Sequence, residues 1–284
     1  MKNTAKFTLM SALVLSGLGS LATTAHAAEE PMKPAVRNTD AQVKFTPSDD
    51  PTDPVDPTDP TNPVDPIDPT DPTKPVDPGT EGPLSLDYAS SFDFGVQKIT
   101  STDQTYQAKA QMVKAKDGSM KAVPNYAQVT DNRGTLKGWS LSVKQNGQFT
   151  SETSKKALTG ATINIANASI STASESKASV LTPAFTLDAT GASQLVMGAK
   201  DGEGAGTFVY QMGKAENVKE NANALKDEAT NSKDAAGKDT ADQRIESSDV
   251  TLKVPGGTQK MSEKYATTLT WTLTDAPAND APAQ

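Results

Sequence analysis

Apolar and polar residues alternate with a period of two in several short runs between residues 83 and 277. Ile163 and Ile165 flank a polar residue, and Val250, Leu252 and Val254 alternate with threonine and lysine. Such alternation is typical of β-strands that bury one face. Similar runs occupy residues 92–96, 106–112, 185–187, 208–212 and 265–273. Polar turn sequences that contain glycine separate the runs, so we expect many short antiparallel strands.

This pattern predicts an all-β protein with a single β-sandwich or Greek-key-like domain over residues 83–284. Residues 213–243 depart from it, because they are polar and rich in alanine. Val218, Ala222, Leu225 and Ala229 fall at helical spacing, although the apolar stripe is thin. We therefore expect a long polar, partly helical excursion from the sheet, and both a functional and a merely disordered segment fit it.

Proline stands at every third position from residue 51 to residue 78, and eight of the ten residues that precede a proline are aspartate. Proline fixes φ near the polyproline II value and restricts the residue before it to extended conformations. We therefore expect residues 48–82 to form a disordered, polyproline-type spacer, which acts either as a rod or only as a solubilising linker. Residues 28–47 are expected to be disordered, apart from a short strand at 41–46.

The N-terminal residues have the order of a secretory signal. Lys2 and Lys6 precede an apolar run at 7–21, and a small-x-small sequence ends at Ala27. We predict that residues 1–27 form a signal peptide, and that the protein is secreted and retained at the cell surface. No later run is apolar and long enough for direct membrane insertion. The last residues offer no anchor, so retention is expected to be non-covalent.

The side-chain inventory restricts the chemistry. The chain has no cysteine, and its one histidine, His26, lies in the predicted signal peptide. These absences argue against Ser-His-Asp and Cys-His catalysis and against nearly every zinc site. Asp201 and Glu203 could form a carboxylate pair, but their surroundings indicate a glycine-rich turn. We predict that the protein is not an enzyme and uses no cofactor and no metal.

The acidic charge is concentrated ahead of the predicted domain. Residues 28–82 carry 13 acidic and four basic side chains, while the chain as a whole has a net charge of −8. The remaining residues are therefore close to neutral. A nucleic-acid partner is not expected, because such partners require a net basic surface.

Both tryptophans of the chain stand two residues before a leucine. Trp139 precedes Leu141, and Trp271 precedes Leu273. Residues two apart on a strand share a face, so each motif places an indole beside a leucine. Two roles stay open: the indoles bind a ligand such as a sugar ring, or they are part of the core.

The two motifs and their surroundings resemble the WxL domain proteins of low-GC Gram-positive bacteria. The supporting stretches read LSLDYASSFDFGVQKI, VTDNRGTLKGWSLSV and YATTLTWTLTDAP. The resemblance covers residues 84–277. It implies a wall-binding domain at 83–284, with peptidoglycan as the ligand of Trp139, Leu141, Trp271 and Leu273. It also implies surface complexes with other WxL proteins and a membrane-anchored protein. The alternative is a secreted adhesin that binds a host or partner protein.

Overall fold

A computed structural model describes residues 34–222, 224 and 244–278. The chain divides into two units, residues 1–44 and 45–284. In the first unit, residues 34–44 form no strand and are exposed, and residues 45–54 of the second unit also form no strand. The short strand expected at 41–46 is therefore wrong: Val43 and Phe45 are 77% and 86% exposed, so they pack against nothing that would stabilise a strand.

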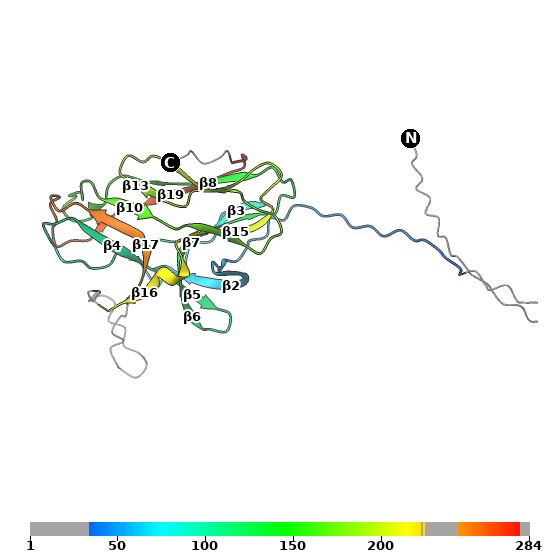
Figure 1. The fold of residues 1–284 in the computed structure, drawn as a ribbon, viewed down its shortest axis with the longest axis horizontal. Helices are drawn as coiled ribbons and strands as arrows, with labels where there is room; N and C mark the ends of the chain where they lie inside the picture. Colours follow the sequence, from blue (N-terminus) through cyan, green and yellow to red (C-terminus); the bar gives the residue numbers. More distant parts are fainter. Residues whose placement is uncertain (1–33, 223, 225–243, 279–284) are drawn as a thin grey trace, which may run out of the picture. The chain divides into compact units, whose positions relative to one another are not determined.

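The second unit is all-β, as predicted, with a single 3-10 turn among its described residues. Its strands form four larger sheets and one two-stranded sheet (Figure 1). The larger sheets follow one another in a propeller-like ring, so the expectation of a sandwich is corrected.

Two of these sheets position the site discussed below. The first has the order β11 (Ser169–Thr172), β15 (Gly206–Met212), β7 (Asn125–Asp131) and β3 (Leu84–Ala89). The second has the order β12 (Val180–Leu181), β14 (Gln194–Ala199), β8 (Trp139–Gln145) and β19 (Leu269–Thr274). Each therefore has an edge strand, β3 and β19 respectively.

The remaining strands form three sheets. One joins β13 (Phe185–Leu187), β10 (Thr162–Ile165), β17 (Arg244–Val254) and β16 (Val218–Asn221), with β4 (Gln104–Lys109) also paired to β17. Another has the order β1 (Val55–Asp56), β2 (Asp59–Ile67), β5 (Gln111–Ala115) and β6 (Met120–Val123). The small sheet pairs β18 (Tyr265–Ala266) with β9 (Thr150–Ser151).

Strand β7 is buried on both faces, which is a reason why the molecule is not a simple sandwich. One face contributes Ala127 and Val129 to the main core, where β8, β10 and β17 also bury their apolar residues. The other face contributes Tyr126 to a second, smaller core beneath the β1–β2–β5–β6 sheet. All seven residues of β7 are buried, so the one-sided burial of a sandwich strand does not apply to it.

The predicted proline-rich spacer is part of this fold, because strands β1 and β2 come from it. Val55 and Val64 are 8% and 5% exposed and pack in the second core. The side chain of Gln128 on β7 fixes β1: its Oε1 accepts from the Val55 N–H (2.8 Å). The expected disordered spacer is therefore wrong over these strands. Polyproline II and β conformations are both extended, so proline is compatible with a short ladder next to the edge of a sheet.

This segment is a tandem repeat of twelve residues. Residues 55–66 read VDPTDPTNPVDP and residues 67–78 read IDPTDPTKPVDP, with identical residues at ten positions. The first copy forms the β1–β2 hairpin, whereas Val76 of the second copy packs against the same core from outside that hairpin. In the first copy Asp56 Oδ1 accepts the Thr58 N–H, and in the second Asp68 Oδ1 accepts the Thr70 N–H, both at 2.8 Å. The two copies thus share their local turns, but only the first forms the β1–β2 hairpin.

The strand expected at 92–96 is absent, because the backbone turns at Gly95. This residue has φ 65°, and its N–H donates to Asp93 Oδ1 (2.7 Å). The guanidinium of Arg244 fills the space that a side chain would occupy there. Phe94 is buried while Val96 is 41% exposed, so the alternation of apolar residues does not reflect a strand with one buried face.

Other runs are interrupted rather than absent. The run at 106–112 divides between β4 and β5, which belong to different sheets. The run at 265–273 divides between β18 and β19, with Thr267 Oγ1 donating to the Gly147 carbonyl at the break (3.0 Å).

The described beginning of the 213–243 excursion holds a 3-10 turn, Ala215–Asn217, and strand β16. Val218 belongs to that strand, not to a helix. Leu225 and Ala229 lie outside the described residues.

Candidate functional site

The two Trp-x-Leu motifs lie on neighbouring antiparallel strands, although they are far apart in the sequence. Strand β19 pairs with β8 so that Leu273 is opposite Leu141 and Trp271 is opposite Val143. Directly paired residues project from the same face of a sheet. Trp139, Leu141 and Val143 therefore share their face with Trp271 and Leu273.

The first motif is fully buried. Trp139 and Leu141 have no exposed surface, and the Trp139 ring lies 5.6 Å from the ring of Phe208. Its Nε1–H donates to the carbonyl of Gly204 (3.0 Å), which satisfies the one polar group of the buried indole. Trp139 thus joins two sheets and presents no face to a ligand.

Gly204 is required by this contact. It has φ +92°, and a Cβ atom built on it would lie 2.5 Å from Trp139 Nε1. A non-glycine residue would be strained by the backbone conformation and would also collide with the indole.

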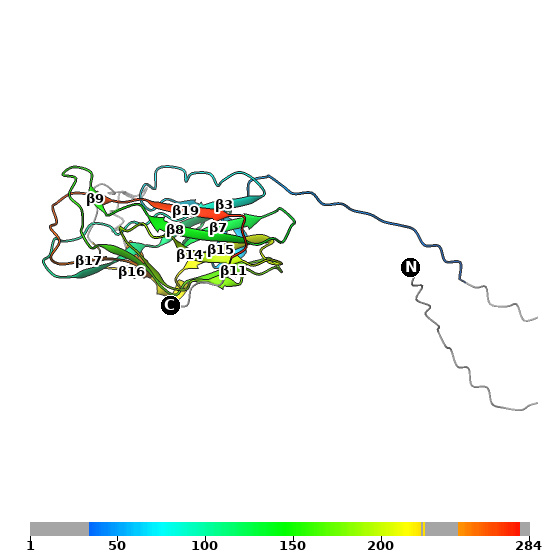
Figure 2. The same ribbon diagram turned by 90° about the horizontal axis from the view of Figure 1, so that it is seen from above.

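The second motif lies at the rim of a groove. Trp271 and Leu273 are half-buried and pack against the main core from the edge strand β19. Figure 2 shows β19 alongside β3, the edge strand of the other sheet. Between them lies a groove of about 650 Å³, whose lining consists of Thr80, Glu81, Gly82, Pro83, Leu84, Leu86, Arg133, Trp271, Leu273, Thr274 and Asp275.

The groove combines apolar walls with a few charged side chains. Leu84 and Leu86 of β3 contribute to one wall, and Trp271 and Leu273 to the other. Binding sites commonly combine an apolar, aromatic surface with a small number of placed polar groups. The arrangement is suited to holding a ligand that has an apolar face and polar substituents.

Arg133 is held in a fixed position at this groove. Its Nε–H and Nη2–H donate to the two carboxylate oxygens of Asp131 (3.0 and 2.8 Å), and Nη2–H also donates to the Gly138 carbonyl (2.8 Å). The hydrogen bonds with Asp131 raise the pKa of the Arg133 guanidinium, and the charge of Asp275 adds to this effect. A bidentate pair of this kind orders the side chain before any ligand arrives.

The outward face of β19 is polar. Thr272 and Thr274 are exposed, and the side-chain amide of Asn146 donates to the hydroxyl oxygens of Thr268 (3.0 Å) and Thr270 (2.8 Å). This polar face is what the threonines between the apolar residues predict.

Sequence reasoning singled out Trp271 and Leu273 but missed the opposite wall of the groove. Arg133 and Leu84 lie in stretches that carry the family resemblance, but no local pattern marks them as neighbours of Trp271. Their proximity follows from the tertiary arrangement of β3 against β19.

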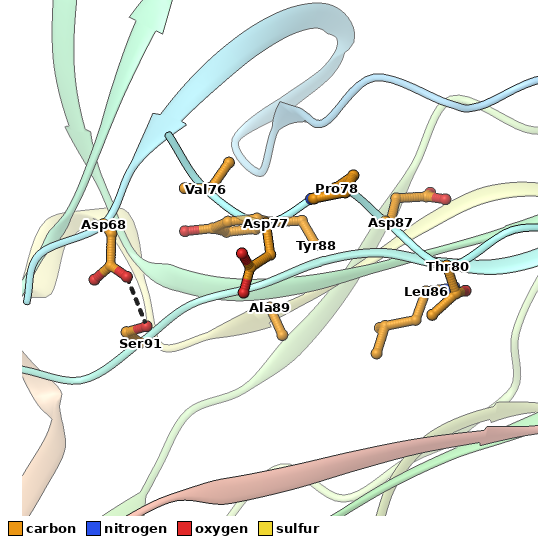
Figure 3. A pocket seen from close by; sticks show the side chains of 11 residues that line it. Asp68, Val76, Asp77, Pro78, Thr80, Leu86, Asp87, Tyr88, Ala89 and Ser91 are labelled. Atoms are coloured by element: carbon orange, nitrogen blue, oxygen red, sulfur yellow. Dashed lines mark hydrogen bonds between the residues drawn. The ribbon is translucent and has the colours of Figure 1, made fainter. Parts of the chain in front are cut away.

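A second, smaller cavity of about 210 Å³ lies between the second repeat copy and β3 (Figure 3). Asp68 closes one end, where it accepts a hydrogen bond from Ser91 (3.3 Å). Asp87 lines the cavity and is buried, and burial raises the pKa of its carboxyl despite hydrogen bonds from Ser85, Thr130 and Gln128. Asp87 is therefore committed to contacts within the protein.

The family comparison follows the same residues. A family model described as "WxL domain surface cell wall-binding" matches residues 32–277. The chain belongs to the WxL family of surface domains that bind the cell wall. The comparisons with curated proteins and with solved structures gave no match.

Two further observations concern the described residues only. No helix among them has the length and apolar character needed to cross a membrane. No group of three or more acidic, histidine or cysteine side chains in the same part of the chain is arranged to hold a metal ion.

Proposed function

We propose that this protein is secreted and held non-covalently on the Gram-positive wall, with peptidoglycan bound in the groove between β3 and β19. The observation that carries the proposal is the different environment of the two motifs. Trp271 and Leu273 line a groove at the rim of the domain, whereas Trp139 and Leu141 are sealed in the core. The wall-binding description of the family supports the same assignment.

The four motif residues then have two roles. Trp271 and Leu273 contact the ligand, because part of each side chain is accessible. Trp139 and Leu141 hold β8 in place, and β19 pairs with β8 along its length. The flat face of an indole can pack against the C–H face of a sugar ring.

The remaining parts of the proposal concern context. We infer that residues 1–27 direct export and that the mature protein is non-catalytic. Other WxL proteins and a membrane-anchored surface protein are proposed as partners in a surface complex. The adhesin alternative makes a different prediction, namely binding to protein and no binding to purified peptidoglycan.

The direct test is sedimentation of residues 28–284 with purified peptidoglycan sacculi. Trp271→Ala should lower the affinity at least about tenfold, because the aromatic side chain that provides most of the contact surface in a binding site contributes more than about 1.4 kcal/mol. Thr272→Ala is the matched control, since Thr272 is exposed on the opposite face of the same strand. Equal binding by a folded Trp271→Ala variant would exclude this groove as the binding site.

Fluorescence distinguishes the two indoles. In a Trp139→Phe variant only Trp271 emits, and solubilised wall fragments should protect it from acrylamide quenching. In a Trp271→Phe variant only the buried Trp139 emits, and we expect weak quenching that wall fragments do not change. Protection of Trp139 but not of Trp271 would reverse the proposed roles.

A further inference from the structure

The groove carries an unbalanced charge. Its lining includes three charged residues, Glu81, Arg133 and Asp275. Arg133 is already neutralised by the bidentate contact with Asp131, whose side chain is only 2% exposed. Glu81 and Asp275 are exposed, and within the described part of the chain neither carboxylate takes a hydrogen bond or a salt bridge. Asp275 interacts electrostatically with Arg133, but together with Asp131 the three carboxylates outnumber the one guanidinium, so the groove is net negative toward a ligand.

Asp275 is placed close to the indole by the strand itself. It follows β19 immediately and stands two residues after Leu273, which is two residues after Trp271. The chain still runs beside β8 at this point, because Ser140 Oγ donates to the Ala276 carbonyl (3.0 Å). Trp271, Leu273 and Asp275 therefore all line the groove from the same side.

The combination of an indole face and carboxylates selects for a cation. The π-face of tryptophan attracts an ammonium group, and carboxylates accept its N–H donors. A neutral sugar can donate hydroxyl hydrogen bonds to the carboxylates but does not balance their charge, and an anionic ligand is repelled by them. A primary ammonium on a short apolar chain satisfies the indole, the leucine walls and the carboxylates together.

We propose that the groove binds a primary amine of the wall polymer, with Trp271 packed against its carbon chain and with Asp275 and Glu81 accepting its N–H donors. The inference rests on the proposed function of the same groove and specifies its ligand. The side-chain amine of a diamino residue in the wall peptide has this chemistry, and so does a sugar amine that carries no acetyl group. The peptide amine is favoured, because its flexible apolar chain can extend between the two leucine walls.

The test compares binding to sacculi before and after acetylation of their free amines with acetic anhydride. Acetylation should weaken the binding of the wild-type protein about tenfold, the range expected for a cation held by an aromatic face and carboxylates. The double variant Glu81→Gln/Asp275→Asn should show the same loss on unmodified sacculi and no further loss on acetylated sacculi. The matched control is Glu175→Gln/Asp201→Asn, which removes the same charge from exposed positions outside the groove and should bind like the wild type.

The outcomes separate this inference from the proposed function. Unchanged binding of the wild-type protein to acetylated sacculi, together with a loss in Trp271→Ala, would overturn the amine and leave the groove in place. Unchanged binding of Trp271→Ala would overturn both. Binding to glycan strands from which an amidase has removed the peptides identifies the source of the amine. Loss of binding to these strands supports the peptide amine. Binding that is retained and is weakened by acetylation overturns that assignment in favour of a sugar amine.

Discussion

Truncation of Val64 to alanine tests whether the proline-rich repeat is part of the folded domain. Val64 is 5% exposed and packs in the second core with Val113 and Tyr126. If residues 48–82 were only a spacer, removal of its methyl groups would have no effect on stability. If β2 docks as the structure shows, the variant should lose stability.

The expected magnitude follows from the buried groups. The substitution removes two buried methyl groups, which contribute about 0.8 kcal/mol each, and it leaves a small cavity beneath the hairpin. We expect the free energy of unfolding to fall by about 2 kcal/mol. For a domain of this size, that corresponds to a decrease in Tm of about 4–8 °C.

The assay is thermal and urea unfolding of residues 28–284, followed by circular dichroism. Val36→Ala is the matched control, because the same two methyl groups are removed from a valine that is 83% exposed. A Val64→Ala variant that unfolds like the Val36→Ala variant would refute the docking of the hairpin.

Two further substitutions probe the core and the pH dependence of the hairpin. Gly204→Ala should lower Tm by several degrees more than Gly118→Ala, since both glycines have positive φ but only the first would collide with Trp139; equal melting temperatures would contradict that contact. Burial raises the pKa of Asp56, but hydrogen bonds from Lys121 and a neighbouring threonine outweigh it and lower the pKa below its ordinary value of 3.8. A carboxyl with a lowered pKa contributes stability above that ordinary value and loses it as the pH falls through the acidic range. Lys121→Met should therefore cost about 1 kcal/mol at pH 7, a modest figure because solvent screens the half-exposed lysine, and progressively less as the pH is lowered below 3.8 toward pH 2, as measured by urea unfolding. The same loss at both pH values would show that Lys121 acts through packing instead.

The sequence alone predicted the all-β class, the alternation of apolar and polar residues in β8 and β19, and the family. These features depend on local period-two patterns and on a pair of motifs that lie in well-formed strands. Alternation failed at residues 92–96, where the backbone turns at Gly95 and the guanidinium of Arg244, far away in the chain, packs against that turn. A pattern within one segment carries no information about such a distant side chain.

The proline repeat was misinterpreted for a related reason. Its composition indicates an extended chain, and the chain is indeed extended, but composition does not show whether an extended chain has a partner. The twelve-residue periodicity, with an apolar residue at positions equivalent to Val55 and Val64, was the available signal. For the groove, the sequence identified Trp271 and Leu273, whereas Leu84 and Arg133 become neighbours only when two edge strands meet.

The walls of the groove come from parts of the domain that are far apart in the sequence, residues 80–86 and residues 271–275. A ribosome makes the first wall long before the second. Until β19 is made, the growing chain therefore has only one wall of the groove. A chain that stops just before β19 lacks Trp271 and Leu273, so on the proposed function it should fold most of its strands and still fail to bind the wall.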